Sequence, residues 1–257
     1  MRREKDLELN KDKKYNTTQL HIKDTLERHI FHRDVFAHYL RWTHVLKIAE
    51  PGMTIVDFGC GTAELLELLY RNRLSPKKYV GLDIRQKTIE ACREEWKKLT
   101  FAGFICQDLT EDDTYNFKAD LVCSFEVMEH VGKKNADQFL QNFKRCGGPK
   151  ATYLLSTPNF DPEVGAAQNH IYSGEVQEHT HQELHALLEK HFQVTAEYGT
   201  FASVRDYKTL MSESQRDVYG QLYPYYDANI MSVLFAPMFP HVARNTLWVL
   251  KNKKGRA

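Results

Sequence analysis

The sequence predicts an α/β fold in which a mostly parallel sheet of seven strands carries helices on both faces. From residue 53 onward, short β-branched and apolar runs alternate with segments whose apolar residues have helical spacing. The clearest unit is the run 53–58, which ends in Gly59-Cys60-Gly61 and is followed by leucines at helical spacing. Strands that alternate with helices in this way form parallel sheets joined by crossover connections.

Each expected element follows from its own local pattern. An amphipathic helix is expected over 29–49, because apolar residues recur there at three- and four-residue steps before Pro51-Gly52. Short β-branched or apolar runs predict strands at 53–58, 78–82, 101–106, 119–124, 152–156, 192–201 and 246–250. Helical periodicity predicts further helices at 63–70, 88–99, 135–146 and 180–191.

The chain divides into a short extension and one larger domain. We expect residues 1–50 to form an N-terminal arm and helical extension, and residues 51–257 a single domain with insertions near 158–178 and 205–243. The first insertion is rich in Pro, Gly, Asn and Gln, and long loops of this kind are usually functional or disordered. The second carries five tyrosines within 207–226. We expect the two insertions to form a substrate cap over one edge of the sheet.

Composition excludes several classes of protein. The chain has 257 residues, of which 42% are hydrophobic and 27% charged, so it is neither disordered nor a fibre nor a disulfide-stapled mini-protein. A net charge of +1 gives no whole-chain argument for binding nucleic acid or an anionic membrane. The five cysteines include no C-x-x-C pair, which favours reduced thiols over disulfides or structural zinc. No run approaches the ~20 apolar residues of a membrane span, so a soluble, cytoplasmic protein is expected.

The turn after the first strand is a candidate cofactor site. In an open α/β sheet, ligands bind at the carboxyl ends of the strands, where a helix N-terminus and free backbone N–H groups are available. Gly59 and Gly61 allow close approach of the backbone to a ligand. A dinucleotide-binding fingerprint would place its third small residue where Glu64 stands, and a carboxylate there would repel a pyrophosphate. NAD and FAD are therefore disfavoured.

A cofactor with a ribose and a base but no phosphate fits the acidic residues better. Asp57, Asp83 and Asp108 end or follow three successive predicted strands. Asp83 is placed to accept hydrogen bonds from both ribose hydroxyls, and Asp108 from an exocyclic adenine amine. Ile84 and Leu109 are candidate apolar walls for the ring.

These motifs and their order resemble those of the class I S-adenosylmethionine-dependent methyltransferases, a family with a Rossmann-like fold. The resemblance rests on Val56-Asp57-Phe58-Gly59-Cys60-Gly61, Gly81-Leu82-Asp83, Gln107-Asp108-Leu109, Ser124-Phe125-Glu126-Val127-Met128-Glu129-His130 and Ser156-Thr157-Pro158-Asn159. It covers roughly residues 52–201 and implies S-adenosylmethionine as cofactor. The cofactor-binding residues that it implies are Asp57, Gly59, Cys60, Gly61, Asp83, Ile84, Asp108, Leu109 and Phe125.

Three residues after the fourth strand are the candidate chemistry site. Glu126, Glu129 and His130 follow that strand, beside the expected methyl group. If the chain is helical there, they share one face and converge on a proton or on a divalent ion such as Mg²⁺. We therefore expect them to orient or deprotonate the acceptor, directly or through a metal.

Two subfamilies resemble this segment. Ubiquinone-biosynthesis O-methyltransferases share Glu-x-x-Glu-His-Val, whereas small-RNA ribose 2′-O-methyltransferases use Glu-x-x-Glu-His as metal ligands, usually followed by a second histidine. Here Val131 stands in that position, and His170 or His179 would have to supply the distal ligand. The metal set implied by this resemblance is Glu126, Glu129, His130 and His179.

The sequence thus predicts a methyltransferase that acts on an oxygen of a small-molecule acceptor. One alternative is a metal-dependent ribose 2′-O-methyltransferase acting on RNA, which would need a basic stripe beside the cofactor pocket. Another is a catalytically inactive methyltransferase-like binding module. Nucleobase methylation is disfavoured, because the loop after the fourth strand has neither a D/N-P-P-Y-type sequence nor a Pro-Cys nucleophile.

Overall fold

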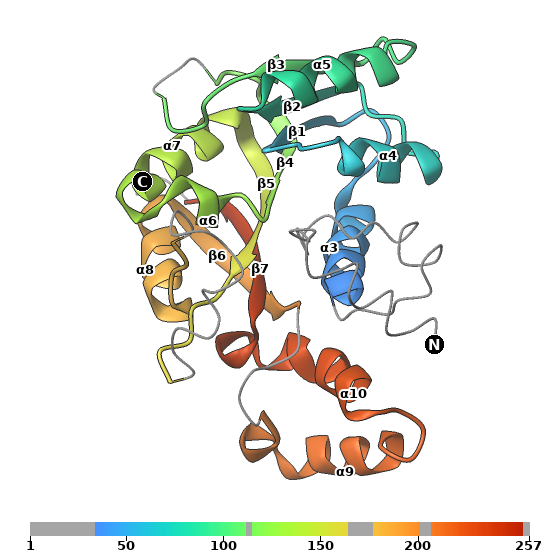
Figure 1. The fold of residues 1–257 in the computed structure, drawn as a ribbon, viewed down its shortest axis with the longest axis vertical. Helices are drawn as coiled ribbons and strands as arrows, with labels where there is room; N and C mark the ends of the chain where they lie inside the picture. Colours follow the sequence, from blue (N-terminus) through green and yellow to red (C-terminus); the bar gives the residue numbers. More distant parts are fainter. Residues whose placement is uncertain (1–33, 112–114, 164–176, 201–206, 254–257) are drawn as a thin grey trace, which may run out of the picture.

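A seven-stranded sheet forms the centre of the protein (Figure 1). The computed structural model describes residues 34–111, 115–163, 177–200 and 207–253. The strands in these residues are β1 (Thr54–Phe58), β2 (Lys78–Asp83), β3 (Ala102–Cys106), β4 (Ala119–Phe125), β5 (Gly147–Pro158), β6 (Phe192–Gly199) and β7 (Asn245–Asn252). Their order across the sheet is β3-β2-β1-β4-β5-β7-β6. Strands β1 to β5 pair in parallel and β7 runs antiparallel to β5 and β6, so the predicted mostly parallel α/β fold is confirmed.

Helices cover both faces of this sheet, as predicted (Figure 1). They are α3 (Asp34–Ile48), α4 (Glu64–Arg71), α5 (Gln86–Glu95), α6 (Met128–Val131), α7 (Ala136–Cys146), α8 (His181–His191), α9 (Glu213–Leu222) and α10 (Ala228–Phe235). Successive strand residues point to opposite faces. Ile55 accordingly packs in the cluster with α3, α4 and α5, whereas its neighbour Val56 packs in the cluster with α7 and α8. Burial on both faces explains why the strands have continuous apolar runs.

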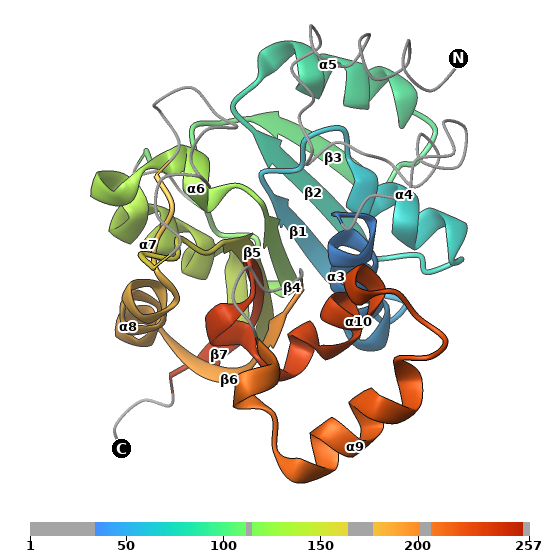
Figure 2. The same cartoon turned by 60° about the horizontal axis from the view of Figure 1, so that its bottom comes forward.

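The second insertion forms a separate helical unit rather than a loop. Helices α9 and α10 lie at one end of the molecule, away from α5, in both views (Figure 2). They enclose a small core of their own, made of Tyr207, Met211, Met231, Phe235, Phe239 and Val242. At Gly199, at the end of β6, a Cβ would lie 2.2 Å from the carbonyl oxygen of Ala236, so only glycine allows this close approach.

Some boundaries differ from the prediction. Strand β5 begins at Gly147, five residues earlier than expected, because Ala119 pairs with Gly147 across a register shift in the β4–β5 ladder. The first 33 residues and residues 164–176 lie outside the described residues, and with them most of the N-terminal arm and of the first insertion. No described helix has the length and apolar character needed to cross a bilayer.

The strand order fixes where a ligand binds. Strands β1 and β4 are neighbours, and from them the chain runs outward through β2 and β3 on one side and through β5 on the other. The connections after β1 and β4 therefore diverge and leave a crevice at the carboxyl ends of these two strands. Gly59 follows β1 there, and Glu126 follows β4.

Candidate functional site

A cavity of about 530 Å³ lies at the carboxyl ends of β1, β2, β3 and β4. Its volume falls in the ordinary range of small-molecule and cofactor pockets. All nine residues predicted to bind the cofactor line it: Asp57, Gly59, Cys60, Gly61, Asp83, Ile84, Asp108, Leu109 and Phe125. The structure thus brings together residues from four strand ends in one enclosed space.

The glycine turn is held by backbone contacts. The N–H groups of Gly59 and Cys60 both donate to the carbonyl oxygen of Leu82, at 2.8 and 2.7 Å. Gly59 has φ +96°, and a Cβ on it would lie 2.3 Å from a methyl group of Val127. A larger residue would therefore be strained and would push the β4 loop away from the β1 loop.

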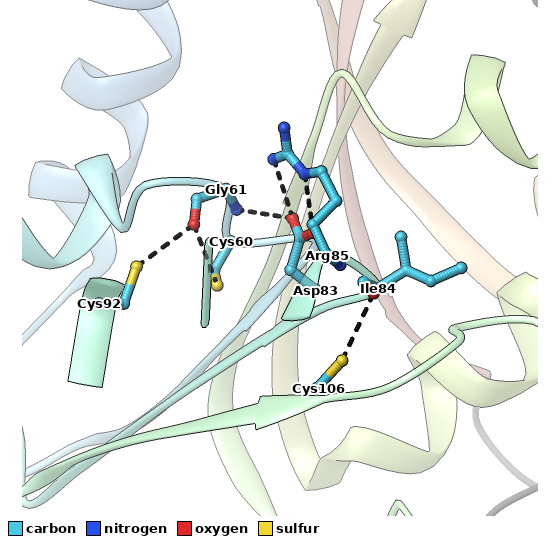
Figure 3. A network of polar contacts seen from close by, with 7 residues as sticks. All are labelled: Cys60, Gly61, Asp83, Ile84, Arg85, Cys92 and Cys106. Carbon is cyan, nitrogen blue, oxygen red and sulfur yellow. Dashed lines mark hydrogen bonds and ion pairs between the residues drawn. The ribbon is translucent and has the colours of Figure 1, made fainter. Parts of the chain in front are cut away.

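Asp83 is the most heavily bonded carboxylate in the cavity. Its Oδ2 accepts from the N–H of Gly61 at 3.0 Å, and its Oδ1 accepts from the N–H of Arg85 at 2.9 Å. The guanidinium of Arg85 donates to both oxygens, with Nε 3.0 Å from Oδ1 and Nη2 3.2 Å from Oδ2 (Figure 3). Burial raises the pKa of Asp83, but these hydrogen bonds outweigh it, so the pKa is lower than usual and the group is a carboxylate at neutral pH.

The two other acidic residues at strand ends differ from Asp83. Asp108 folds into a turn, because its Oδ1 accepts from both the N–H and the hydroxyl of Thr110, at 2.8 and 2.7 Å. Asp57 is buried and accepts from the hydroxyl of Tyr79 at 2.7 Å. Burial raises the pKa of Asp57 to about 7, although the Tyr79 hydrogen bond acts in the opposite direction.

Glu126 is fixed by three side chains distant in sequence. It has φ +57°, which places it in the left-handed region directly after β4. Its Oε1 lies 2.6 Å from Nη1 of Arg41 and accepts from the hydroxyl of Ser156 at 2.7 Å. Its Oε2 accepts from the amide of Asn245 at 2.6 Å. The carboxylate at the cavity wall is thus a rigid acceptor with an ionic partner on α3.

Glu129 and His130 differ in burial, although His130 Nε2 lies 3.9 Å from Glu129 Oε1. The carboxyl group of Glu129 is buried away from the cavity and accepts from the hydroxyl of Thr157 at 2.9 Å. Burial, with the charge of Glu126 as a second cause, raises the pKa of Glu129 well above its usual value. His130 lines the cavity with its side chain 46% exposed, and its partial burial is the main cause that lowers its pKa below the usual 6.5. His130 is therefore a neutral imidazole at pH 7, able to accept a proton.

The four predicted metal ligands are not brought together. Helix α6 begins at Met128, so Glu126 lies outside it and the expected common helical face is absent. His179 is buried beside Asn159 and does not line the cavity, and His170 lies outside the described residues. In the part of the chain that the structure describes, no three His, Cys, Asp or Glu side chains are grouped to hold a metal ion. The described residues do not fit a bound metal.

Sequence reasoning missed one wall of the cavity. His38, Arg41 and Trp42 of α3 line it, whereas this helix was assigned to the N-terminal extension and none of its residues was predicted to belong to the site. Arg41 could have indicated this wall, since it is a charged residue within the apolar run of an amphipathic helix. A buried arginine needs an ionic partner elsewhere in the fold. Conversely, none of the described residues of 207–243, the second insertion that was expected to form part of the substrate cap, lines the cavity.

Comparisons with known proteins agree with this geometry. The model of a family described as a methyltransferase domain matches residues 31–218. Ribosomal protein L11 methyltransferase of Tolumonas auensis is 34% identical over 83 residues, which cover 32% of this chain and 27% of that protein. Small RNA 2′-O-methyltransferase of Arabidopsis thaliana is 28% identical over 116 residues, 42% of this chain and 12% of that protein. The chain thus matches only a small part of the length of these relatives.

A solved structure shows the same fold. Geranyl diphosphate C-methyltransferase of Streptomyces coelicolor, in complex with Mg²⁺, geranyl diphosphate and S-adenosylhomocysteine, superposes with a TM-score of 0.57. The alignment has 10% sequence identity and covers 84% of this chain and 81% of that chain. At this identity the likeness concerns the fold alone.

Proposed function

The chain belongs to the class I S-adenosylmethionine-dependent methyltransferase family, and on that premise we propose that it methylates an oxygen of a small-molecule acceptor. The acceptor would bind between α3 and the loop after β4, next to Glu126 and His130. The observation that carries this proposal is His130, a neutral imidazole that lines the same cavity as the predicted cofactor residues.

The residues at the β1, β2 and β3 ends fit the cofactor. Gly59, with φ +96°, lets the turn after β1 pack directly against Val127 of the loop after β4, and Gly59, Cys60 and Gly61 of this turn all line the cavity. Asp83 would accept from the ribose hydroxyls and Asp108 from the adenine amine, with Leu109 and Ile84 beside the ring. When bound, S-adenosylmethionine supplies a methyl group activated by a sulfonium.

The chain's own residues would position the acceptor and remove its proton. The acceptor oxygen forms the new carbon–oxygen bond while the carbon–sulfur bond breaks, and the hydroxyl proton passes to the ring nitrogen of His130. Glu126, held by Arg41 and Ser156, keeps a fixed negative charge near the imidazole and stabilises its protonated form. Glu129 would act only by holding the loop through Thr157.

The charge of the cavity favours a small molecule over a polyanion. Five acidic side chains line it, Asp57, Glu64, Asp83, Asp108 and Glu126, against the two guanidiniums of Arg41 and Arg85. Both guanidiniums are paired with carboxylates. RNA binding depends on many lysines and arginines that neutralise successive phosphates, and two guanidiniums can serve a single anionic group but not a polyanion.

Mass spectrometry of metabolite extracts incubated with the protein and isotope-labelled S-adenosylmethionine tests the proposal. We expect the label in a small-molecule fraction, with a rate about 10²- to 10⁴-fold lower for His130→Ala. The matched control is His185→Ala, because His185 lies on α8 and does not line the cavity. Cofactor binding without any label transfer would instead indicate the inactive binding module.

A second candidate is ribose 2′-O-methylation of RNA, which the similarity to the Arabidopsis small RNA 2′-O-methyltransferase favours. This reaction requires Glu126, Glu129 and His130 to converge on a divalent ion. Within the described residues, these side chains do not form a group that could hold a metal ion. A chelator separates the two candidates: activity that survives chelation supports the small-molecule reaction. Label found in RNA, and lost on chelation, would replace it by the second candidate.

A further inference from the structure

Every acceptor position of Asp83 is already in use. A carboxylate offers about four lone-pair sites to hydrogen-bond donors. Asp83 receives four donors: the N–H groups of Gly61 and Arg85, and Nε and Nη2 of the Arg85 guanidinium. The two hydroxyls of a ribose therefore find no unoccupied acceptor on Asp83 in this arrangement (Figure 3).

Only two of these four donors are free to leave. The Gly61 N–H belongs to the glycine turn, whose neighbours Gly59 and Cys60 are fixed to Leu82. The Arg85 N–H lies at the start of α5. The Arg85 side chain, in contrast, is 51% exposed, and within the described residues its guanidinium donates to Asp83 alone. Because the guanidinium is half exposed and can turn toward solvent, it is easier to displace than the two backbone donors, so it is the donor that a ribose would replace.

The displaced guanidinium would remain in the cavity. Arg85 lines the same cavity as His130, and its charge contributes, after burial, to the lowered pKa of His130. The guanidinium thus borders the expected ribose site at Asp83 and shares one cavity with the expected proton acceptor, His130. Its planar fork of N–H donors suits the paired oxygens of a carboxylate or phosphate.

We propose that Arg85 is a latch. When it pairs with Asp83 it closes the ribose site, and the cofactor's ribose displaces it so that it holds an anionic group of the acceptor. The acceptor is therefore a carboxylate- or phosphate-bearing molecule that binds after the cofactor. This inference rests on the proposed function, because it takes the cavity to be a cofactor site.

Two consequences can be measured. Removing the guanidinium removes a competitor for Asp83, so the cofactor binds more tightly. An anion that binds the freed guanidinium also favours the cofactor-bound state, and by reciprocity of linked binding it strengthens cofactor binding.

Calorimetric titration with S-adenosylhomocysteine tests the first consequence. This ligand has no net charge at neutral pH, so loss of one positive charge from the protein does not change its long-range attraction. We expect Arg85→Ala to bind it about two- to fivefold more tightly than the wild type, as the loss of a weak ion pair implies. The matched control is Arg71→Ala: Arg71 is 69% exposed, pairs with Glu67 on α4 and does not line the cavity, so affinity should not change.

Inorganic phosphate is the probe for the second consequence. At constant ionic strength, replacing chloride by phosphate should tighten S-adenosylhomocysteine binding to the wild type and leave Arg85→Ala unaffected. An equal effect of phosphate on both proteins, or none on either, would overturn the anionic-acceptor part of the proposal.

The outcomes separate this proposal from the function on which it rests. Wild-type protein that does not bind S-adenosylhomocysteine contradicts the cofactor site and the latch together. Wild-type protein that binds it, with Arg85→Ala binding equally or more weakly, overturns the latch alone.

Discussion

The two halves of the cavity are held by different kinds of contact. The loops after β1 and β2 are fixed locally, by backbone N–H groups that donate to Leu82 and Asp83. The loop after β4 is fixed by side chains from remote segments: Arg41 from α3 and Asn245 from β7 both reach Glu126. The loops after β1 and β2 form the cofactor half of the cavity, and short sequence motifs are enough to specify it. The loop after β4 forms the acceptor half, which takes shape only when remote segments pack together. This difference predicts which changes cost stability and which cost binding.

The largest effect should come from breaking the buried pair in the acceptor half. The Arg41 side chain is 3% exposed, so Arg41→Ala leaves the Glu126 carboxylate buried without its ionic partner. We expect a loss of about 3–5 kcal/mol in the free energy of unfolding, measured by denaturant titration. Adding Glu126→Gln should recover part of this loss. A double variant less stable than Arg41→Ala alone would show that the pair is not the cause.

Asp83 provides the corresponding change in the cofactor half. Asp83→Asn keeps the shape of the side chain but loses the charge that the ribose hydroxyls would use. We expect S-adenosylhomocysteine to bind on the order of 100-fold more weakly, because hydrogen bonds to charged groups contribute more than neutral ones. Asp120→Asn is the control, since Asp120 accepts from the N–H of Thr54 at the amino end of β1. Equal losses in the two variants would point to general destabilisation.

Asp57 should make stability depend on pH. Burial raises its folded-state pKa to about 7, above the unfolded value, so the folded protein holds an extra proton between roughly pH 4 and 7. Its contribution to stability is therefore complete at low pH and is lost as the pH rises through this window. We expect Asp57→Asn to remove about 2 kcal/mol of the decrease in unfolding free energy between pH 5 and pH 8. An unchanged pH dependence in Asp57→Asn would contradict the raised pKa.

The smallest expected effect is the change in kcat per pH unit that the titration of His130 causes. Because burial lowers its pKa below 6.5, the neutral base is present through the neutral range and is lost only at lower pH. We expect kcat to level off above pH 6.5 and to fall about tenfold per pH unit below the pKa. His130→Gln should remove this acid limb along with most of the rate. An acid limb that persists in the residual activity of His130→Gln would assign the titration to another group.

The same comparison explains how much the sequence could predict. The seven strands, the helices α3, α4, α5, α7 and α8, and the nine cofactor-half residues follow from patterns a few residues long, and the structure places all nine around one cavity, whereas α9 and α10 were not predicted. The different burial of Glu129 and His130 was not predictable, because it depends on where α6 begins after the left-handed Glu126. The role of Ser156 and Thr157 in holding Glu126 and Glu129 likewise depends on the pairing of β4 with β5.

The position of Arg41 in the cavity wall and the pairing of Arg85 with Asp83 were both missed, for opposite reasons. Arg41 and Glu126 are 85 positions apart, and no local pattern relates them. Arg85 lies two residues from Asp83, and an aspartate that accepts from the N–H two residues later is a common turn. The turn was therefore predictable in principle, but the return of the guanidinium to both oxygens depends on the three-dimensional shape of the cavity.

The position of the transferred methyl group tests the central claim most directly. Tandem mass spectrometry of the product formed with isotope-labelled S-adenosylmethionine locates the label on one atom of the acceptor. We predict that the label is on an oxygen of a small molecule and that its transfer needs His130. Label on a nitrogen or carbon atom, or transfer at an undiminished rate by His130→Ala, would contradict the account.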